Sequence, residues 1–180
     1  MIAAINLNPE LDLNLLSFPE FDTSSLPSAF IKYQRVEKVI NQLPQPITNI
    51  VNQMLGLFKQ NCKSKILIDY KVKNLKKGQP GCSIAGWHLD YTENPNRSEP
   101  LEEHLIFSTH VGTEFITTPM VVLPEDTHFT SIIKRNNSFD YIAVKPNTVT
   151  KYSRLNLHRG PIIIEDCRRV VIRLTKINEI

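Results

Sequence analysis

The stretch from Cys167 to Ile177, CRRVVIRLTKI, has two different sides when it is read as a β-strand. Successive side chains of a strand point to opposite faces of the sheet. One side is apolar apart from its first member, and consists of Arg168, Val170, Ile172 and Leu174. We expect this side to pack against helices. The other side holds Arg169, Val171 and Arg173, so it directs two guanidinium groups to the opposite face, where a buried cation requires an anion.

Further segments before this one have the β-branched and alternating character of strands, and Pro, Gly, Asn or acidic residues bound them. They are residues 65–74, 82–91, 102–111, 113–123, 140–146 and 149–158. About seven or eight short strands with short connections favour a sandwich or a jelly-roll barrel. The chain is therefore predicted to be mainly β after residue 62.

The segment before residue 62 has a different pattern. Apolar residues recur at helical spacing over 36–43 and again over 47–58, and Pro44 and Pro46 separate the two runs. We therefore predict that residues 1–62 are mostly helical and support one sheet from outside. A length of 180 residues fits a single domain, with the jelly-roll core over residues 63–180.

The composition, the N-terminus and the cysteine spacing limit the classes of protein that are expected. A net charge of +3 neither indicates nor excludes a nucleic-acid partner. The N-terminus lacks the basic and apolar regions of a signal peptide, and no apolar run is long enough to span a bilayer. Cys62, Cys82 and Cys167 lie far apart and form no CxxC pair, so neither a disulfide framework nor a zinc knuckle is expected. A soluble, cytoplasmic protein is predicted.

Three residues have the side chains of a metal site. His88 and Asp90 are two positions apart, so in a strand they project to the same side. His158 precedes a Gly-Pro turn and is the third candidate. Two imidazoles and one carboxylate on one face of an ion leave the opposite positions open, an arrangement used with non-haem Fe(II). Zinc fits the same atoms.

Read as a strand, residues 151–158 place Tyr152, Arg154, Asn156 and His158 on one face. Such a polar face is typical of a cavity rather than of a packed interior. Arg169 and Arg173 are expected to face the same cavity, because the other side of their strand is apolar and packs against helices. There a guanidinium can bind a carboxylate through two parallel hydrogen bonds. A small dicarboxylate that chelated the metal at one end would meet an arginine at the other.

The sequences WHLDY, LNLHRGP and CRRVVIR together resemble the His-x-Asp, distal His and trailing Arg of the Fe(II)- and 2-oxoglutarate-dependent oxygenases. The resemblance covers roughly residues 80 to 175. It implies a double-stranded β-helix (jelly roll, cupin-like) with N-terminal helices on its major sheet. It also implies that His88, Asp90 and His158 bind Fe(II), and that an arginine after His158 binds 2-oxoglutarate.

On this resemblance the cosubstrate contacts are assigned to Arg169, Arg173, Arg168, Tyr152 and Asn156, and a substrate contact to Arg154. Which arginine is the anchor stays open. Many members have a small hydroxyl residue two positions after the anchor, where Arg169 is followed by Val171 and Arg168 by Val170. The implied partners are a small-molecule cosubstrate and an unidentified primary substrate.

Two other functions use the same fold. One is a cupin-like binding protein without catalysis, and the other is a metal-dependent hydrolase or isomerase with the same three ligands. A different metal set around His104 and His110, which share strand parity, is a further alternative. Glu125 and Asp126 lie in a turn-rich stretch and are expected to be solvated.

Overall fold

The computed structural model describes residues 5–59, 64–82, 84–90, 95 and 102–178. This part of the chain is mainly β and its sheets are antiparallel, which confirms the predicted class. The large sheet contains, in spatial order, β2 (Asp12–Ser17), β9 (Thr148–Ser153), β5 (Glu102–Ser108), β11 (Cys167–Asn178), β4 (Ser64–Leu75) and β3 (Ala29–Arg35).

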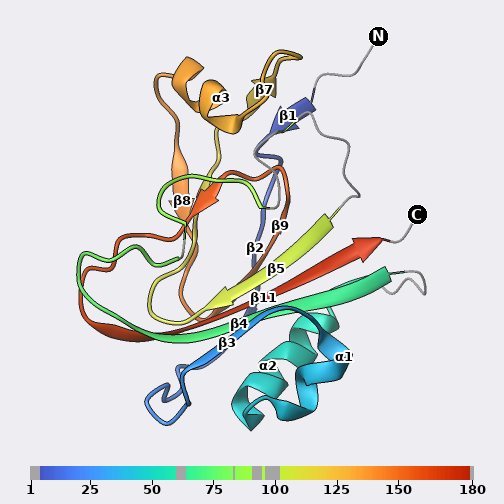
Figure 1. Cartoon of the computed structure of the whole chain (residues 1–180), viewed down its shortest axis with the longest axis vertical. Coiled ribbons are helices and arrows are strands. Elements are labelled where there is room, and N and C mark those ends of the chain that lie inside the picture. Colours follow the sequence, from blue (N-terminus) through green and yellow to red (C-terminus); the bar gives the residue numbers. More distant parts are fainter. Residues whose placement is uncertain (1–4, 60–63, 83, 91–94, 96–101, 179–180) are drawn as a thin grey trace.

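A smaller sheet lies on one side of the large one (Figure 1). It contains β10 (His158–Arg159), β6 (Glu114–Ile116) and β8 (Tyr141–Ala143) in that order. A bridge between His88 and His158 extends this sheet beyond β10. A separate pair is formed by β1 (Ile5–Leu7) and β7 (Met120–Val122).

The centre of the large sheet is β11, which pairs with β5 on one side and β4 on the other. Val170, Ile172 and Leu174 are fully buried in the main hydrophobic cluster with residues of α2 (Gln45–Leu55), such as Ile47 and Val51. Burial of such a side chain stabilises the fold by about 1.5–3 kcal/mol. The predicted two-sided character of this strand is confirmed, because Arg169, Val171 and Arg173 line a cavity on the other face.

The N-terminal segment, residues 1–62, is less helical than predicted. Of its described residues, 5–59, helices occupy only α1 (Val36–Val39), the short 3-10 helix η1 (Ile40–Gln42) and α2, and they lie below the large sheet in Figure 1. Residues 29–35 instead form β3, where half-buried and exposed residues alternate. The free edge of β4 explains this difference, since pairing with it satisfies backbone groups that a helix would satisfy internally.

Three other segments differ from their predictions. Residues 82–91 form no strand in their described part, where residue 88 makes a single bridge. Residues 149–158 divide into β9 and β10 at a turn at residues 154–155, and residues 113–123 divide into β6 and β7 around Pro119. The short helix α3 (Phe129–Arg135) was not predicted.

Asp126 is buried, contrary to the expectation that it is solvated. Its carboxylate accepts hydrogen bonds from the Leu123 backbone, the Ser131 hydroxyl and the Arg135 guanidinium. The hydrogen bond from Arg135 is the main cause that holds the pKa of Asp126 well below its ordinary value, against the opposing effect of burial. This carboxylate therefore ties the end of β7 to α3.

We expect Asp126→Asn to lower the free energy of unfolding by about 1–2 kcal/mol near neutral pH, because it weakens charged hydrogen bonds to a partly exposed partner. A depressed pKa in the folded state contributes stability above the unfolded pKa of about 4, and this contribution disappears as the pH falls through the folded value. The difference between variant and parent should therefore shrink in acid. Chemical denaturation at several pH values measures it, with Glu125→Gln as the exposed control. An equal loss in both variants would contradict this role.

No helix among the described residues is both long and apolar enough to cross a membrane. Cys82 and Cys167 are free thiols, and Cys62 lies outside the described residues.

Candidate metal centre

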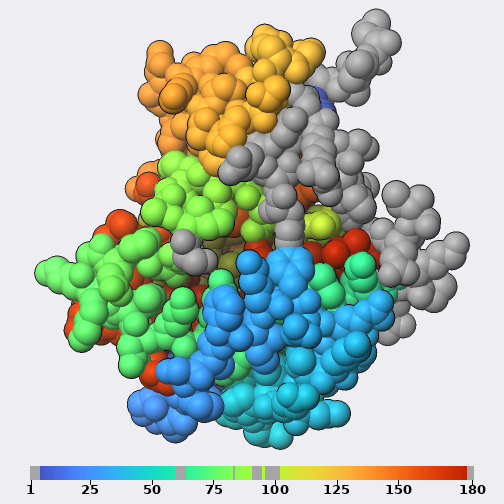
Figure 2. Space-filling view, viewed as in Figure 1, coloured from blue at the N-terminus to red at the C-terminus, as the bar shows by residue number. Residues whose placement is uncertain are grey.

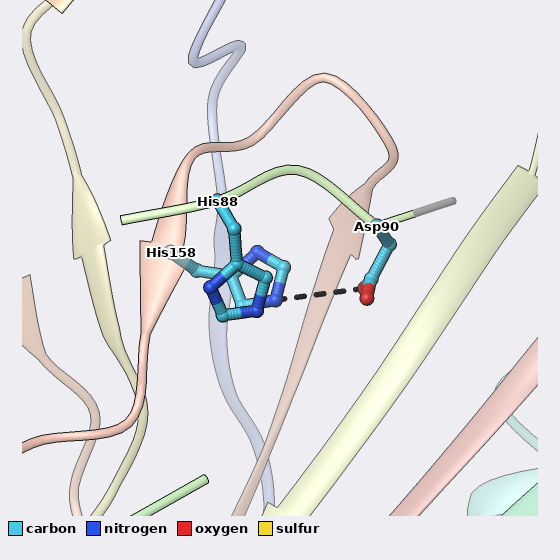
Figure 3. Close-up of side chains that lie close together, drawn as sticks. All are labelled: His88, Asp90 and His158. Carbon is cyan, nitrogen blue, oxygen red and sulfur yellow. Dashed lines mark ion pairs between the residues drawn. The ribbon is translucent and has the colours of Figure 1, made fainter. Parts of the chain in front are cut away.

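The three predicted ligands converge, although not by the strand geometry that suggested them. The backbones of His88 and His158 are hydrogen bonded in both directions, at 2.9 and 3.0 Å. This bridge places the two imidazole rings side by side, with centroids 4.4 Å apart, and Asp90 lies across from them (Figure 3). The nitrogen and oxygen donor atoms of all three residues lie within 4.8 Å of one another.

The imidazoles are oriented to present their Nε2 atoms. Nδ1 of His88 lies 3.0 Å from the Gly86 carbonyl oxygen, and Nδ1 of His158 lies 3.0 Å from the Asn156 carbonyl oxygen. A carbonyl only accepts, so each Nδ1 carries the proton and each Nε2 keeps its lone pair. Such outer hydrogen bonds are typical of metal-binding histidines.

Asp90 is held from two sides. The Tyr152 hydroxyl donates to its Oδ2 at 2.7 Å, and the Arg173 guanidinium donates to its Oδ1. Arg173 also donates to Oδ2 of Asp69, at 3.0 and 2.7 Å. Burial by itself would raise the pKa of Asp90, but His158 and Arg173 lower it below its ordinary value. The carboxylate is therefore ionised and fixed in orientation.

The protonation states of His158 and Tyr152 also suit metal binding. Burial lowers the pKa of His158, aided by His88 and Arg173, so the neutral imidazole is favoured. Burial and then Asp90 raise the pKa of Tyr152 well above its ordinary value, so the phenol keeps the proton that it donates. Metal binding needs neutral imidazoles and an ionised carboxylate.

The donor set fits a divalent ion. Oδ2 of Asp90 lies 3.6 Å from Nε2 of His158, and all three residues are at most 8% exposed. An ion with bonds of about 2.1 Å keeps neighbouring donors roughly 3 Å apart, so a small side-chain rotation closes the set. Among the described residues, no other group of His, Cys, Asp or Glu side chains converges in this way. The side chains around His104 and His110 therefore do not form the alternative metal set.

Arg169 differs from the other two arginines. Its guanidinium lines the same cavity as the three ligands and is 3% exposed. It donates to the Gly81 carbonyl, its Nε has no hydrogen-bond partner, and within the described residues no carboxylate pairs with it. Burial lowers its pKa to about 10. In the described part of the chain, Arg169 is thus a buried cation without a counterion, in the same cavity as the candidate metal ligands.

Gly81 allows this approach. A Cβ at position 81 would lie 2.9 Å from Nη1 of Arg169 and 3.0 Å from the Pro161 carbonyl oxygen, so a larger residue would push against both. Glycine at this position therefore lets the backbone carbonyl approach the guanidinium closely.

Three other predicted site residues lie away from the cavity. Arg168 donates to the carbonyls of Thr23 and Leu26 and to Asn74. Asn156 donates to the Pro9 carbonyl and accepts from Ser153, and Arg154 is buried without lining the cavity. The turn at residues 154–155 ends the period of two, so Arg154 and Asn156 do not share a strand face with Tyr152.

Two further residues lie near the site: Asp69 was not predicted, and His104 was considered only as a ligand of a different metal set. Asp69 pairs with Arg173 across β4 and β11, where their Cα atoms are register partners. The His104 ring stacks on the Tyr152 ring with centroids 4.8 Å apart, and its Nδ1 lies 3.0 Å from the Thr175 hydroxyl. Burial lowers the pKa of His104 to about 3, so it supports Tyr152 as a neutral ring. An acidic residue in the otherwise apolar and basic β4 was the available signal for Asp69.

We expect Tyr152→Phe to weaken divalent metal binding by roughly 10-fold to 100-fold, the usual cost of losing an outer hydrogen bond to a ligand. The ring and its stacking on His104 remain, so the fold should be unaffected. Titration with Mn(II) measures the affinity. Tyr141→Phe, which removes an exposed hydroxyl, is the control. Unchanged affinity in Tyr152→Phe would show that its hydrogen bond does not orient Asp90.

No protein family model and no curated protein matches the chain. Among solved structures, the fold is similar to EvdO2 from Micromonospora carbonacea var. aurantiaca complexed with 2-oxoglutarate, at 12% identity and a TM-score of 0.47, over 84% of this chain and 67% of that one. A second EvdO2 crystal structure matches at 12% identity and a TM-score of 0.45, over 85% and 67%. Both scores are below 0.5, so we base no assignment on this similarity.

Proposed function

We propose that this protein is an Fe(II)- and 2-oxoglutarate-dependent oxygenase, most simply a hydroxylase. One observation carries the proposal: a single cavity of about 320 Å³ holds both the His88, Asp90 and His158 group and the uncompensated guanidinium of Arg169. A cosubstrate with a chelating end and a distal carboxylate satisfies both at once.

The order of the strands supports a double-stranded β-helix over residues 63–180. Following the chain from β4, successive segments fall in the large sheet, at the His88 bridge of the small sheet, in β5 of the large sheet, and in β6 and β8 of the small one. The chain then returns to β9, crosses to β10 and ends in β11. This alternation between two facing sheets is the pattern of a jelly roll.

The ligand set favours a reactive site over a structural one. Three protein ligands on one side of an ion leave positions for exogenous groups, whereas structural sites close the coordination sphere. His88, Asp90 and His158 would hold Fe(II), with Arg173 and Tyr152 orienting the carboxylate. Zinc fits the same donors. Arg169 favours iron, because its guanidinium can bind the distal carboxylate of 2-oxoglutarate, the cosubstrate of the iron oxygenases.

When bound, iron and 2-oxoglutarate supply the oxidising chemistry, in which dioxygen is consumed and 2-oxoglutarate is converted to succinate and carbon dioxide. The chain's own residues bind and orient. Arg169 would bind the distal carboxylate through paired hydrogen bonds and thereby fix its distance from the ligands. Ile106 and Val171 supply apolar wall to the cavity and reduce its water content.

The test is spectroscopic. Anaerobic addition of Fe(II) and then 2-oxoglutarate to the purified protein should produce a weak metal-to-ligand charge-transfer band in the visible. Succinate formation under air, measured separately, tests turnover. A folded protein that binds Fe(II) but gives no band on addition of 2-oxoglutarate would refute the proposal and leave a binding protein or a hydrolase on the same barrel.

A further inference from the structure

The cavity that holds the candidate metal ligands has a second cationic wall. Its lining includes Lys32 and Tyr33 of β3 and Lys71 of β4, together with the apolar side chains of Phe30 and Ile84. We refer to Phe30, Lys32, Tyr33 and Lys71 as the lysine rim. In Figure 2 a recess lies between the blue surface of β3 and the green surface of residues 84–90 above it.

A bulge in β3 turns the rim toward the cavity. The register of β3 against β4 shifts between Ile31 and Gln34, and Tyr33 has a φ of 56°, in the left-handed region. Its backbone nitrogen donates to Oδ1 of Asp69 at 3.1 Å. Adjacent residues of a regular strand point to opposite faces, whereas Lys32 and Tyr33 both line this cavity. Bulges re-aim side chains in this way next to functional sites.

The cavity has more positive charge than the metal and the cosubstrate need. Among the described residues, its lining holds four cationic side chains, those of Lys32, Lys71, Arg169 and Arg173, and two carboxylates, those of Asp69 and Asp90. Arg173 lies between both carboxylates. A ferrous ion adds two positive charges and the 2-oxoglutarate dianion removes two. An excess of two positive charges therefore remains, and Lys32 and Lys71 are the cations that no bound group has neutralised.

Lys71 is held in position over an aromatic ring. Its Nζ lies 5.3 Å from the centroid of the Phe30 ring, which is 60% exposed. Partial burial lowers the pKa of Lys71, with Arg173, Lys73 and Lys32 adding to the effect against Asp69. A cation that is half-buried among other cations gains from an anionic ligand, because the ligand relieves their mutual repulsion.

We propose that Lys32 and Lys71 of the lysine rim bind an anionic oxygen group, a carboxylate or a phosphate, of the primary substrate. Phe30 of the rim and Ile84 contact an apolar part of the same molecule. The inference rests on the proposed function, since it identifies the rim's ligand as the molecule to be oxidised. A cavity of about 320 Å³ suits a small molecule better than a polymer.

Isothermal titration of the full-length protein, loaded with Mn(II) and saturating 2-oxoglutarate, tests the proposal. Arg169 is then occupied, so it does not compete for the probes. The probes are phenyl phosphate, benzoate and neutral benzyl alcohol. We expect at least one of the anions to bind at least about tenfold more tightly than the alcohol, with an affinity that falls as salt rises. The stronger of the two anions distinguishes phosphate from carboxylate.

The variants K32Q and K71Q should each weaken binding of the preferred anion about fivefold to tenfold. K73Q is the matched control, because Nζ of Lys73 lies 5.6 Å from the same Phe30 ring but Lys73 lines no part of this cavity. The charge-transfer band with Fe(II) and 2-oxoglutarate should be retained in all three variants.

Several results would overturn the anion site. One is that the anions and the alcohol bind equally well. Another is that K73Q weakens anion binding as much as K71Q does. A third is that anions bind only when 2-oxoglutarate is omitted, which would place the anion at Arg169. Failure of the oxygenase proposal looks different. A missing band in the parent protein, with lysine-dependent anion binding retained, refutes the oxygenase and supports the anion site.

Discussion

His158→Ala is expected to abolish metal retention. The substitution removes one of three donors together with the imidazole that lies beside that of His88, so the remaining pair of ligands would hold a divalent ion weakly. The loss should exceed the roughly 10-fold to 100-fold cost of removing an outer hydrogen-bond partner. Metal content after gel filtration, and titration with Mn(II), measure the effect.

The control for this variant removes a histidine elsewhere. His110→Asn replaces an exposed residue with a φ of 65°, a conformation that asparagine tolerates, and it should leave metal binding unchanged. Circular dichroism checks that both variants fold. Full metal stoichiometry in His158→Ala would mean that His158 is not a ligand and would remove the basis of the proposed centre.

Arg169→Met is expected to weaken 2-oxoglutarate binding while the metal affinity stays unchanged. The lost charged hydrogen bonds are worth about 1.5–3 kcal/mol, which corresponds to roughly 10-fold to 150-fold in affinity. Arg169→Lys should recover only part of this, because an ammonium group does not match a carboxylate through two parallel bonds. Titration of the charge-transfer band with 2-oxoglutarate measures the affinity.

The neighbouring arginine provides the matched control. Arg168→Met removes a guanidinium from the same strand, but from the opposite face, where it binds the carbonyls of Thr23 and Leu26. We expect this variant to lose stability and keep its affinity for 2-oxoglutarate. The reverse result, with cosubstrate binding lost in Arg168→Met and retained in Arg169→Met, would move the anchor to Arg168.

Arg169→Met should also change stability, with the opposite sign to most buried substitutions. The guanidinium is buried and has no counterion among the residues that the structure describes, and replacing an uncompensated buried charge by an apolar group of similar length removes a desolvation cost. We therefore expect the cosubstrate-free variant to melt at or above the temperature of the parent. A large fall in melting temperature would show that Arg169 serves the fold instead.

The local pattern of the sequence was sufficient for the central strands. In β11, apolar residues alternate with charged ones, and this period of two correctly predicted which side packs against helices and which side lines the cavity. The same parity placed Arg169 and Arg173 together on the cavity face. Such assignments succeed because the direction of a side chain in a strand depends only on its own backbone.

Local pattern failed where the backbone left regular structure. Residues 29–35 became a strand because β4 offered an edge, and residues 84–90 are not a strand although they supply two of the candidate ligands. His88 and His158 meet through a bridge between segments distant in the sequence. The turn after Ser153 likewise separated Arg154 and Asn156 from the cavity.

The sequence by itself determined the mainly β class, the residue types of the candidate metal group and the cationic face of β11. Only the tertiary structure decided what each arginine does. Arg173 is neutralised by Asp69 and Asp90, Arg168 binds backbone carbonyls, and Arg169 is left without a carboxylate among the described residues. The physical reason is that a side chain's direction is local, whereas its counterion is supplied by strands that are distant in the sequence and adjacent in the fold.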